Sequence, residues 1–111
     1  MPETNSLKAL KDQYFNLDKN FNKLFLACAS DGQRDQLRSA YVNSRDNYWE
    51  ARNRVFQEDE PLVKKMIVDL KNAQNQIEQA LQNLQNIVQV IQVITAAVHL
   101  GSSLITLGSM F

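Results

Sequence analysis

Apolar side chains recur along the first quarter of the chain at alternating intervals of three and four residues. This spacing places them on one face of an α-helix. The members of this stripe are Leu7, Leu10, Tyr14, Leu17, Phe21, Leu24 and Cys28. Ser30, Asp31 and Gly32 follow; a glycine tolerates a left-handed helix C-cap, and an aspartate can cap the next helix. We therefore predict a first helix over about residues 5–30.

A second, less regular stripe follows and stops at an acidic boundary. Its members are Leu37, Tyr41, Ser44, Tyr48, Ala51 and Val55. Three acidic residues, 58–60, then precede Pro61. Proline disfavours a helical residue before it and suits the first turn of a new helix. The second helix is therefore expected to end before residue 61, where a third begins.

From Pro61 the three-and-four spacing continues without a gap, and no further proline or glycine occurs before Gly101. The stripe comprises Val63, Met66, Leu70, Ala73, Ile77, Ala80, Leu84, Ile87, Ile91, Ile94 and Val98. A helix over residues 61–100 would be about 60 Å long, against about 37 Å for each of the first two. The pattern predicts an all-α, antiparallel bundle of three helices with a long third helix, which a break near Gly101 could divide to give a short fourth.

Charge is distributed very unevenly along this pattern. The 12 Lys or Arg and 12 Asp or Glu residues balance, and all of them lie between Glu3 and Glu78. Residues 79–111 carry none, and His99 is their one titratable side chain. We interpret residues 1–111 as a single domain, with a charged bundle over 1–78 and an uncharged amphipathic helix over 79–111. The zero net charge gives no electrostatic indication of a nucleic-acid partner.

The uncharged segment has two faces, which are the candidate functional residues. A neutral polar stripe contains Gln85, Gln89, Gln92, Thr95, His99, Ser102 and Thr106. An apolar face for membrane or oligomer contacts contains Ile87, Ile91, Ile94, Val98, Leu104 and Ile105. Solvent-facing helices normally recruit Lys and Glu, so a stripe of amides, hydroxyls and one imidazole favours another environment.

Three interpretations of this segment compete. In the first it enters a membrane, because residues 84–111 exceed the about 20 residues needed to span hydrocarbon, and neutral polar groups are tolerated there when they meet water or one another. In the second it forms the core of a homo-oligomer, since Ile87, Ile91 and Ile94 at successive heptad positions favour assemblies of more than two strands. In the third a break at Gly101 folds a short helix back within a monomer, and the stripe faces water.

The sequence offers no catalytic constellation. His99 has no neighbouring ligand for a metal, and Cys28 on the first stripe is expected to be a buried, inert thiol. The line of Arg38, Arg45 and Arg52 with its nearby aromatic residues could touch phosphate, but the interleaved acids favour a salt-bridged surface. Tyr48 and Trp49 are candidates for an exposed aromatic anchor, although partial burial is the commoner fate. We expect no enzyme, cofactor, metal, nucleic acid or small-molecule substrate.

An uncharged apolar segment behind a charged helical bundle resembles the architecture of alpha-helical pore-forming toxins. This resemblance rests on residues 79–111 and implies self-assembly and membrane insertion. We therefore expect a small non-enzymatic protein that inserts its C-terminal helix into membranes. The alternative is a soluble homo-oligomeric interaction module, such as an adaptor, a secretion-system subunit or a toxin-neutralising partner. No signal-peptide pattern is present, so the soluble form is expected in the cytoplasm or released by another route, with a membrane-associated form.

Overall fold

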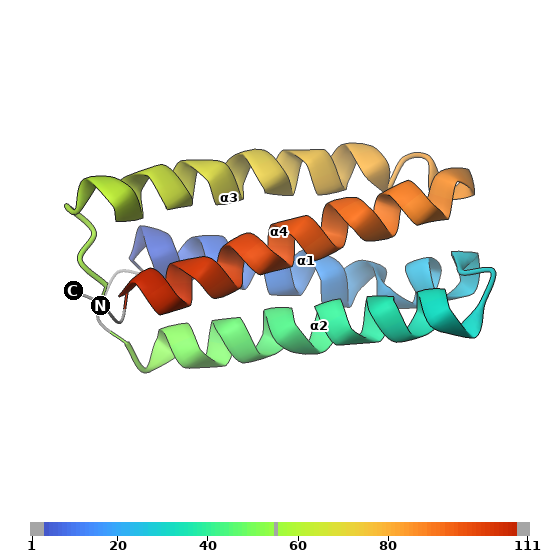
Figure 1. Ribbon diagram of the computed structural model, residues 1–111, viewed down its shortest axis with the longest axis horizontal. Coiled ribbons are helices and arrows are strands. Elements are labelled where there is room, and N and C mark those ends of the chain that lie inside the picture. Colours follow the sequence, from blue (N-terminus) through green and yellow to red (C-terminus); the bar gives the residue numbers. More distant parts are fainter. Residues whose placement is uncertain (1–3, 55, 109–111) are drawn as a thin grey trace.

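The protein is a bundle of four helices that lie side by side (Figure 1). The computed structural model describes residues 4–54 and 56–108. Within these ranges the elements are α1 (Asn5–Ala27), α2 (Asp31–Arg52), α3 (Pro61–Ala80), a 3₁₀ turn η1 (Leu84–Asn86) and α4 (Ile87–Gly108). Consecutive helices run in opposite directions, and the bundle measures 42 × 23 × 21 Å. The expected all-α antiparallel bundle is confirmed.

Helix α4 occupies the position that closes the bundle. It packs along both α3, with which it forms a hairpin, and α2. Helices α2 and α4 run in the same direction, so their C-terminal ends lie at the same end of the molecule (Figure 1). Helix α1 begins at this end as well. Helix α3 begins at this end too, at Pro61.

The long third helix is interrupted at residues 81–86, which corrects the expected break near Gly101. Gly101 lies within α4, whereas α3 ends at Ala80 and the 3₁₀ turn precedes Ile87. The amide of Asn83 bonds to the carbonyl of Ala80 at 3.0 Å, which tightens the chain into a turn. Asparagine favours such turns. The apolar spacing nevertheless continues through this turn, because Leu81 and Leu84 pack against the same core as the helices on either side.

The helix starts follow the capping rules, with one shift from the sequence expectation. The hydroxyl of Thr4 accepts a hydrogen bond from the Leu7 amide at 3.1 Å, and the hydroxyl of Ser30 accepts one from Gln33 at 3.2 Å. Ser30, not Asp31, therefore caps α2. Gly32 lies in the first turn of α2, and α1 has already ended at Ala27. The expected glycine C-cap and the extension of α1 to residue 30 are wrong.

The core forms two clusters along the bundle axis, and α4 contributes to both. The larger cluster includes Leu17 and Leu24 of α1, Leu37 of α2 and Ile77 of α3, and α4 covers them. The smaller cluster contains Leu10, Val63 and Leu104, the last from α4. On α2 the buried face passes through Ala40 and Asn47. The predicted stripe members Tyr41 and Tyr48 are half-buried at the seam with α1. Val55, the last expected member of that stripe, lies outside the described residues.

Candidate functional site: helix α4 and its surroundings

The apolar face of α4 points into the bundle. Its members Ile87, Ile91, Ile94, Val98 and Leu104 are buried, and Ile105 is half-buried. Ile94, near the middle of the helix, is only 1% exposed. The structure therefore brings this predicted set together as one surface, and in this state the surface is covered by the other three helices.

The neutral polar stripe lies on the opposite, outward side. Gln85, Gln89, Gln92, Thr95, His99 and Thr106 are exposed, and Ser102 is half-buried. Val88, 54% exposed, and Ala96 belong to the same outward side. In this state the stripe meets water, as in the third of the sequence interpretations. The result is a folded helix with no charged Lys, Arg, Asp or Glu on either face.

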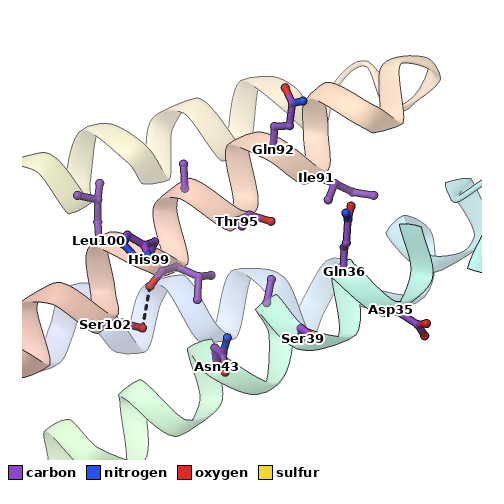
Figure 2. A pocket seen from close by; sticks show the side chains of 13 residues that line it. Asp35, Gln36, Ser39, Asn43, Ile91, Gln92, Thr95, His99, Leu100 and Ser102 are labelled. Atoms are coloured by element: carbon purple, nitrogen blue, oxygen red, sulfur yellow. Dashed lines mark hydrogen bonds between the residues drawn. The ribbon is translucent and has the colours of Figure 1, made fainter. Parts of the chain in front are cut away.

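A groove of about 910 Å³ runs between α2 and α4. Ala40 and Ile91 are among the apolar residues that line it, and the polar lining includes Ser39, Asn43 and Thr95. Figure 2 shows Gln36 of α2 reaching towards Ile91 of α4, while Asp35 points away from α4. The Asp35 carboxylate is ion-paired with Arg38 at 3.0 Å. The groove thus presents an almost neutral surface.

Beneath the groove, buried polar side chains join α4 to α1 and α2 around Gly101. The Gln13 amide donates to the Ala97 carbonyl at 2.9 Å, and the Asn47 amide donates to the Ser102 hydroxyl at 3.1 Å. Both amides are at least nine-tenths buried. A Cβ on Gly101 would lie only 3.0–3.2 Å from the side chains of Leu10, Gln13 and Asn47. A glycine at this position therefore allows α4 to approach the two amides closely.

Sequence analysis did not identify Gln13 or Asn47, although a signal for each is present. Gln13 lies three residues after Leu10 and four before Leu17, and Asn47 is placed in the same way between Ser44 and Ala51. Both positions fit the three-and-four spacing of a buried face. The neighbouring Tyr14 and Tyr48 also fit a three-and-four stripe and are more apolar, so spacing alone does not favour the two amides.

Aromatic rings form a continuous seam along α1 and α2. Phe21 contacts Tyr41 with ring centroids 4.8 Å apart, and Tyr14 stacks on Tyr48 at 5.8 Å. The Tyr41 hydroxyl donates a hydrogen bond to the Asp18 carboxylate. This bond raises the pKa of Tyr41 above the ordinary tyrosine range, because losing the proton would place two negative charges side by side; a hydrogen bond with Tyr14 and partial burial act in the same direction.

This pKa shift predicts a loss of stability at high pH. A phenol whose pKa is higher in the folded than in the unfolded state stabilises the fold below the unfolded pKa of about 10, and the contribution disappears as pH rises through the folded pKa. We expect the urea midpoint to fall as pH rises above about 10, and to fall less in Tyr41→Phe. Phenolate absorbance should show an ionisation above the usual tyrosine range that Tyr41→Phe abolishes and Asp18→Asn moves to lower pH. An unchanged titration in these two variants would contradict the assignment.

The two reactive groups that the sequence analysis considered, Cys28 and His99, lie in different surroundings. Cys28 is buried, its thiol donates to the Leu24 carbonyl at 3.4 Å, and burial raises its pKa, which keeps the thiolate scarce. His99 lies on the exposed side of α4. Among the described residues, no group of three His, Cys, Asp or Glu side chains is placed to hold a metal.

One helical segment of the described residues, Leu84–Leu107, is long and apolar enough to cross a membrane by length and composition. Its 24 residues correspond to about 36 Å of helix, against about 30 Å of bilayer hydrocarbon. The core helix of a soluble bundle meets the same criterion, and 39% of the most apolar stretch of this segment is buried. Comparisons with protein-family models, curated proteins and solved structures find no match.

Proposed function

We propose that this protein permeabilises membranes: α4 leaves the bundle, enters the bilayer and assembles with α4 of other copies. The observation that carries the proposal is the absence of charge from both faces of α4 in the folded bundle. A soluble helix needs an apolar face for the core but gains nothing from an uncharged outer face. A helix that also enters lipid requires this composition, since one Lys, Arg or Asp at the bilayer centre costs about 2.5–3.5 kcal/mol.

The contacts that hold α4 in the bundle are apolar contacts and hydrogen bonds between neutral groups. His99 is the one ionisable side chain of α4. The release of α4 therefore breaks no ion pair that involves a Lys, Arg, Asp or Glu of this helix. Gln13 and Asn47 donate to carbonyls of α4 at Ala97 and Val98. These carbonyls lie inside the helix, where the backbone hydrogen bonds of a helix remain satisfied in lipid. After release, the unpaired amides remain on α1 and α2, and α4 carries no Lys, Arg, Asp or Glu.

Release also exposes the core of α1, α2 and α3. Leu17, Leu24, Leu37 and Ile77 are at most 2% exposed in the folded bundle and are covered by α4. Exposing aliphatic side chains costs about 1.5–3 kcal/mol each. Contact with lipid or with other copies has to offset this cost, so insertion is coupled to assembly. In the assembly, the neutral stripe would line a water-filled lumen or pair between helices.

The substitution Ala96→Asp tests the proposal without disturbing the core. Ala96 is exposed near the middle of Leu84–Leu107, on the same side as the neutral stripe, so an aspartate there meets water in the bundle but has to enter the bilayer centre when α4 inserts. We expect dye release from liposomes to be at least about tenfold slower, because an aspartate at the bilayer centre costs more than the 1.4 kcal/mol that corresponds to a factor of ten. The free energy of unfolding should fall by less than about 1 kcal/mol, because aspartate has a lower helix propensity than alanine by about 0.7 kcal/mol.

Two matched variants isolate the effect of charge on α4. Ala96→Asn has a similar size without the charge and should retain more of the release rate than Ala96→Asp. Val68→Asp adds the same charge to an exposed position of α3, where Val68 is 55% exposed, and should leave release unchanged. Dye release at the wild-type rate in Ala96→Asp, or none from the wild-type protein, would reject the proposal.

The α2–α4 groove favours a second candidate, a soluble homo-oligomeric interaction module. Its neutral lining would suit the uncharged outer face of α4 from a second copy. This candidate expects a defined multimer in analytical ultracentrifugation without lipid and no liposome leakage. A monomer that causes leakage would exclude it.

A further inference from the structure

We propose that a surface patch at one end of the α1–α2 seam is the membrane-docking site, and that it binds the headgroup region of bilayers containing anionic lipid. This Trp49 patch consists of Lys11 and Phe15 of α1 with Tyr48, Trp49 and Arg52 of α2. The inference rests on the proposed function, because it specifies how the folded protein contacts a membrane before α4 is released.

The five side chains form one contact chain. Lys11 lies 6.0 Å from the centre of the Phe15 ring, which contacts the Tyr48 ring edge to face at 5.5 Å. The Tyr48 and Trp49 rings are 5.8 Å apart, and the Arg52 guanidinium lies 4.8 Å from the Trp49 ring. The three neighbouring aromatic rings thus lie between Lys11 at one end and Arg52 at the other.

The apolar part of this patch is open to solvent. Trp49 is 50% exposed and Phe15 is 47% exposed, and both belong to the largest residue types. Leaving such rings in water costs free energy that contact with the lipid interface recovers. Trp and Tyr concentrate at membrane interfaces because their rings are amphipathic, and Lys and Arg extend their charged ends towards the headgroups.

The charges around the patch favour a lipid surface over single-stranded nucleic acid. Three other guanidinium groups each lie within 3.0 Å of a carboxylate that is three or four residues earlier in the chain, namely those of Arg34, Arg38 and Arg54. Arg52 instead contacts the rings of Tyr48 and Trp49. A nucleic-acid strand needs a basic track along its backbone, which the paired arginines do not supply. A headgroup layer requires only a local cation beside an apolar group.

The patch lies at the end of the bundle where α4 also ends. Trp49 and Arg52 are in the last turn of α2, and α2 and α4 run in the same direction (Figure 1). Docking through the patch therefore places the end of the bundle at which α4 ends towards the bilayer. This placement connects docking with release, since the C-terminal end of α4 lies at the docked end of the molecule.

Trp49 is the one tryptophan of the chain, so its fluorescence reports docking directly. The full-length protein is titrated with phosphatidylcholine vesicles and with vesicles in which part of the lipid is phosphatidylserine. With the anionic vesicles only, we expect Trp49 emission to shift to the blue and to be quenched by brominated lipid. Salt should weaken both effects, because it screens the attraction between Arg52 and the headgroups. Arg52→Gln should lower vesicle affinity about fivefold, the effect of one basic residue near an anionic surface. Phe15→Ser should lower it several-fold.

Two control variants make the same chemical changes at the other end of the bundle. Arg34→Gln removes one positive charge near the start of α2, and Leu26→Ser removes an apolar side chain that is 83% exposed at the end of α1. Both should bind as the wild type does, and circular dichroism should show that all four variants fold. Equal effects of Arg52→Gln and Arg34→Gln would overturn the proposal, as would equal binding to neutral vesicles.

Other outcomes separate the docking site from the proposed function. A Trp49 signal that responds to a single-stranded oligonucleotide but not to vesicles would overturn the docking site in favour of a nucleic-acid surface. Leakage without any change in Trp49 fluorescence would overturn the docking site and leave the permeabilising function standing. A Trp49 blue shift on anionic vesicles without leakage would support the docking site and reject the function.

Discussion

Replacing Gly101 with valine should lower the free energy of unfolding by about 3–5 kcal/mol. Even a single Cβ at this position would lie 3.0 Å from both Leu10 Cδ2 and Gln13 Oε1. These side chains are at most 2% exposed, so they have little room to move. Displacing Gln13 or Asn47 also breaks their hydrogen bonds to α4 and leaves buried amides unpaired. Urea denaturation monitored by circular dichroism measures the loss.

Two alanine variants control for backbone effects in this experiment. Gly101→Ala should change stability little, because the helix propensity gained, up to about 1 kcal/mol, offsets the close contacts. Gly32→Ala should leave stability unchanged or raise it, since a Cβ there meets only the Ser30 hydroxyl at an ordinary 3.8 Å. A Gly101→Val variant as stable as the wild type would show that α4 does not pack against α1 and α2 in this way.

Ile94→Ala should destabilise the bundle by about 2–5 kcal/mol and accelerate membrane permeabilisation. Ile94 is 1% exposed and packs in the larger core cluster. Truncating it weakens the attachment of α4 while adding no charge that would oppose insertion. If the cost of releasing α4 falls by about 3 kcal/mol, the released population rises about 100-fold. The prediction is opposite in sign to that for Ala96→Asp.

Cys28 provides the measurement that links stability to release. It is the one cysteine in the chain and is buried in the same core cluster as Ile94. Its reaction with a thiol reagent should therefore be slow in the wild type and faster in Ile94→Ala. Val88→Ala is the matched control on α4, because Val88 is 54% exposed and its truncation should leave both rates near wild type. Faster thiol labelling without faster dye release would separate opening of the bundle from membrane entry and contradict the proposed mechanism.

The sequence sufficed for the helical class and for the two faces of α4, but not for the break between α3 and α4. Spacing defines which residues share a face, and Ile94 is buried while Thr95 is exposed on α4, as the two stripes indicate. The turn at residues 81–86 was missed because both helices face one core, so Leu84 keeps the apolar period while the backbone reverses. Spacing carries no information on whether the chain reverses direction.

The buried amides show a second limit of pattern analysis. Gln13 is 2% exposed because α4 supplies a carbonyl for it from 84 residues further along the chain. Burial of an amide depends on such a partner, and no local property of the sequence reveals it. The aromatic seam was only partly expected for a related reason. Tyr48 and Trp49 were recognised as neighbours on α2, whereas the contact of Tyr48 with Phe15 depends on how α1 packs against α2.

The order of the helices along the chain also affects how the protein is made. A ribosome synthesises α1, α2 and α3 before α4, and translation at about 5–20 residues per second leaves the 22 residues of α4 incomplete for roughly 1–4 s. During that interval the nascent chain has a core with one side open, because α4 covers both clusters. Among the described helices α4 is the most apolar, and it follows the other three along the chain, so folding competes with any membrane or chaperone that meets α4 as it emerges. Under the proposed function, the choice between solution and bilayer begins during translation.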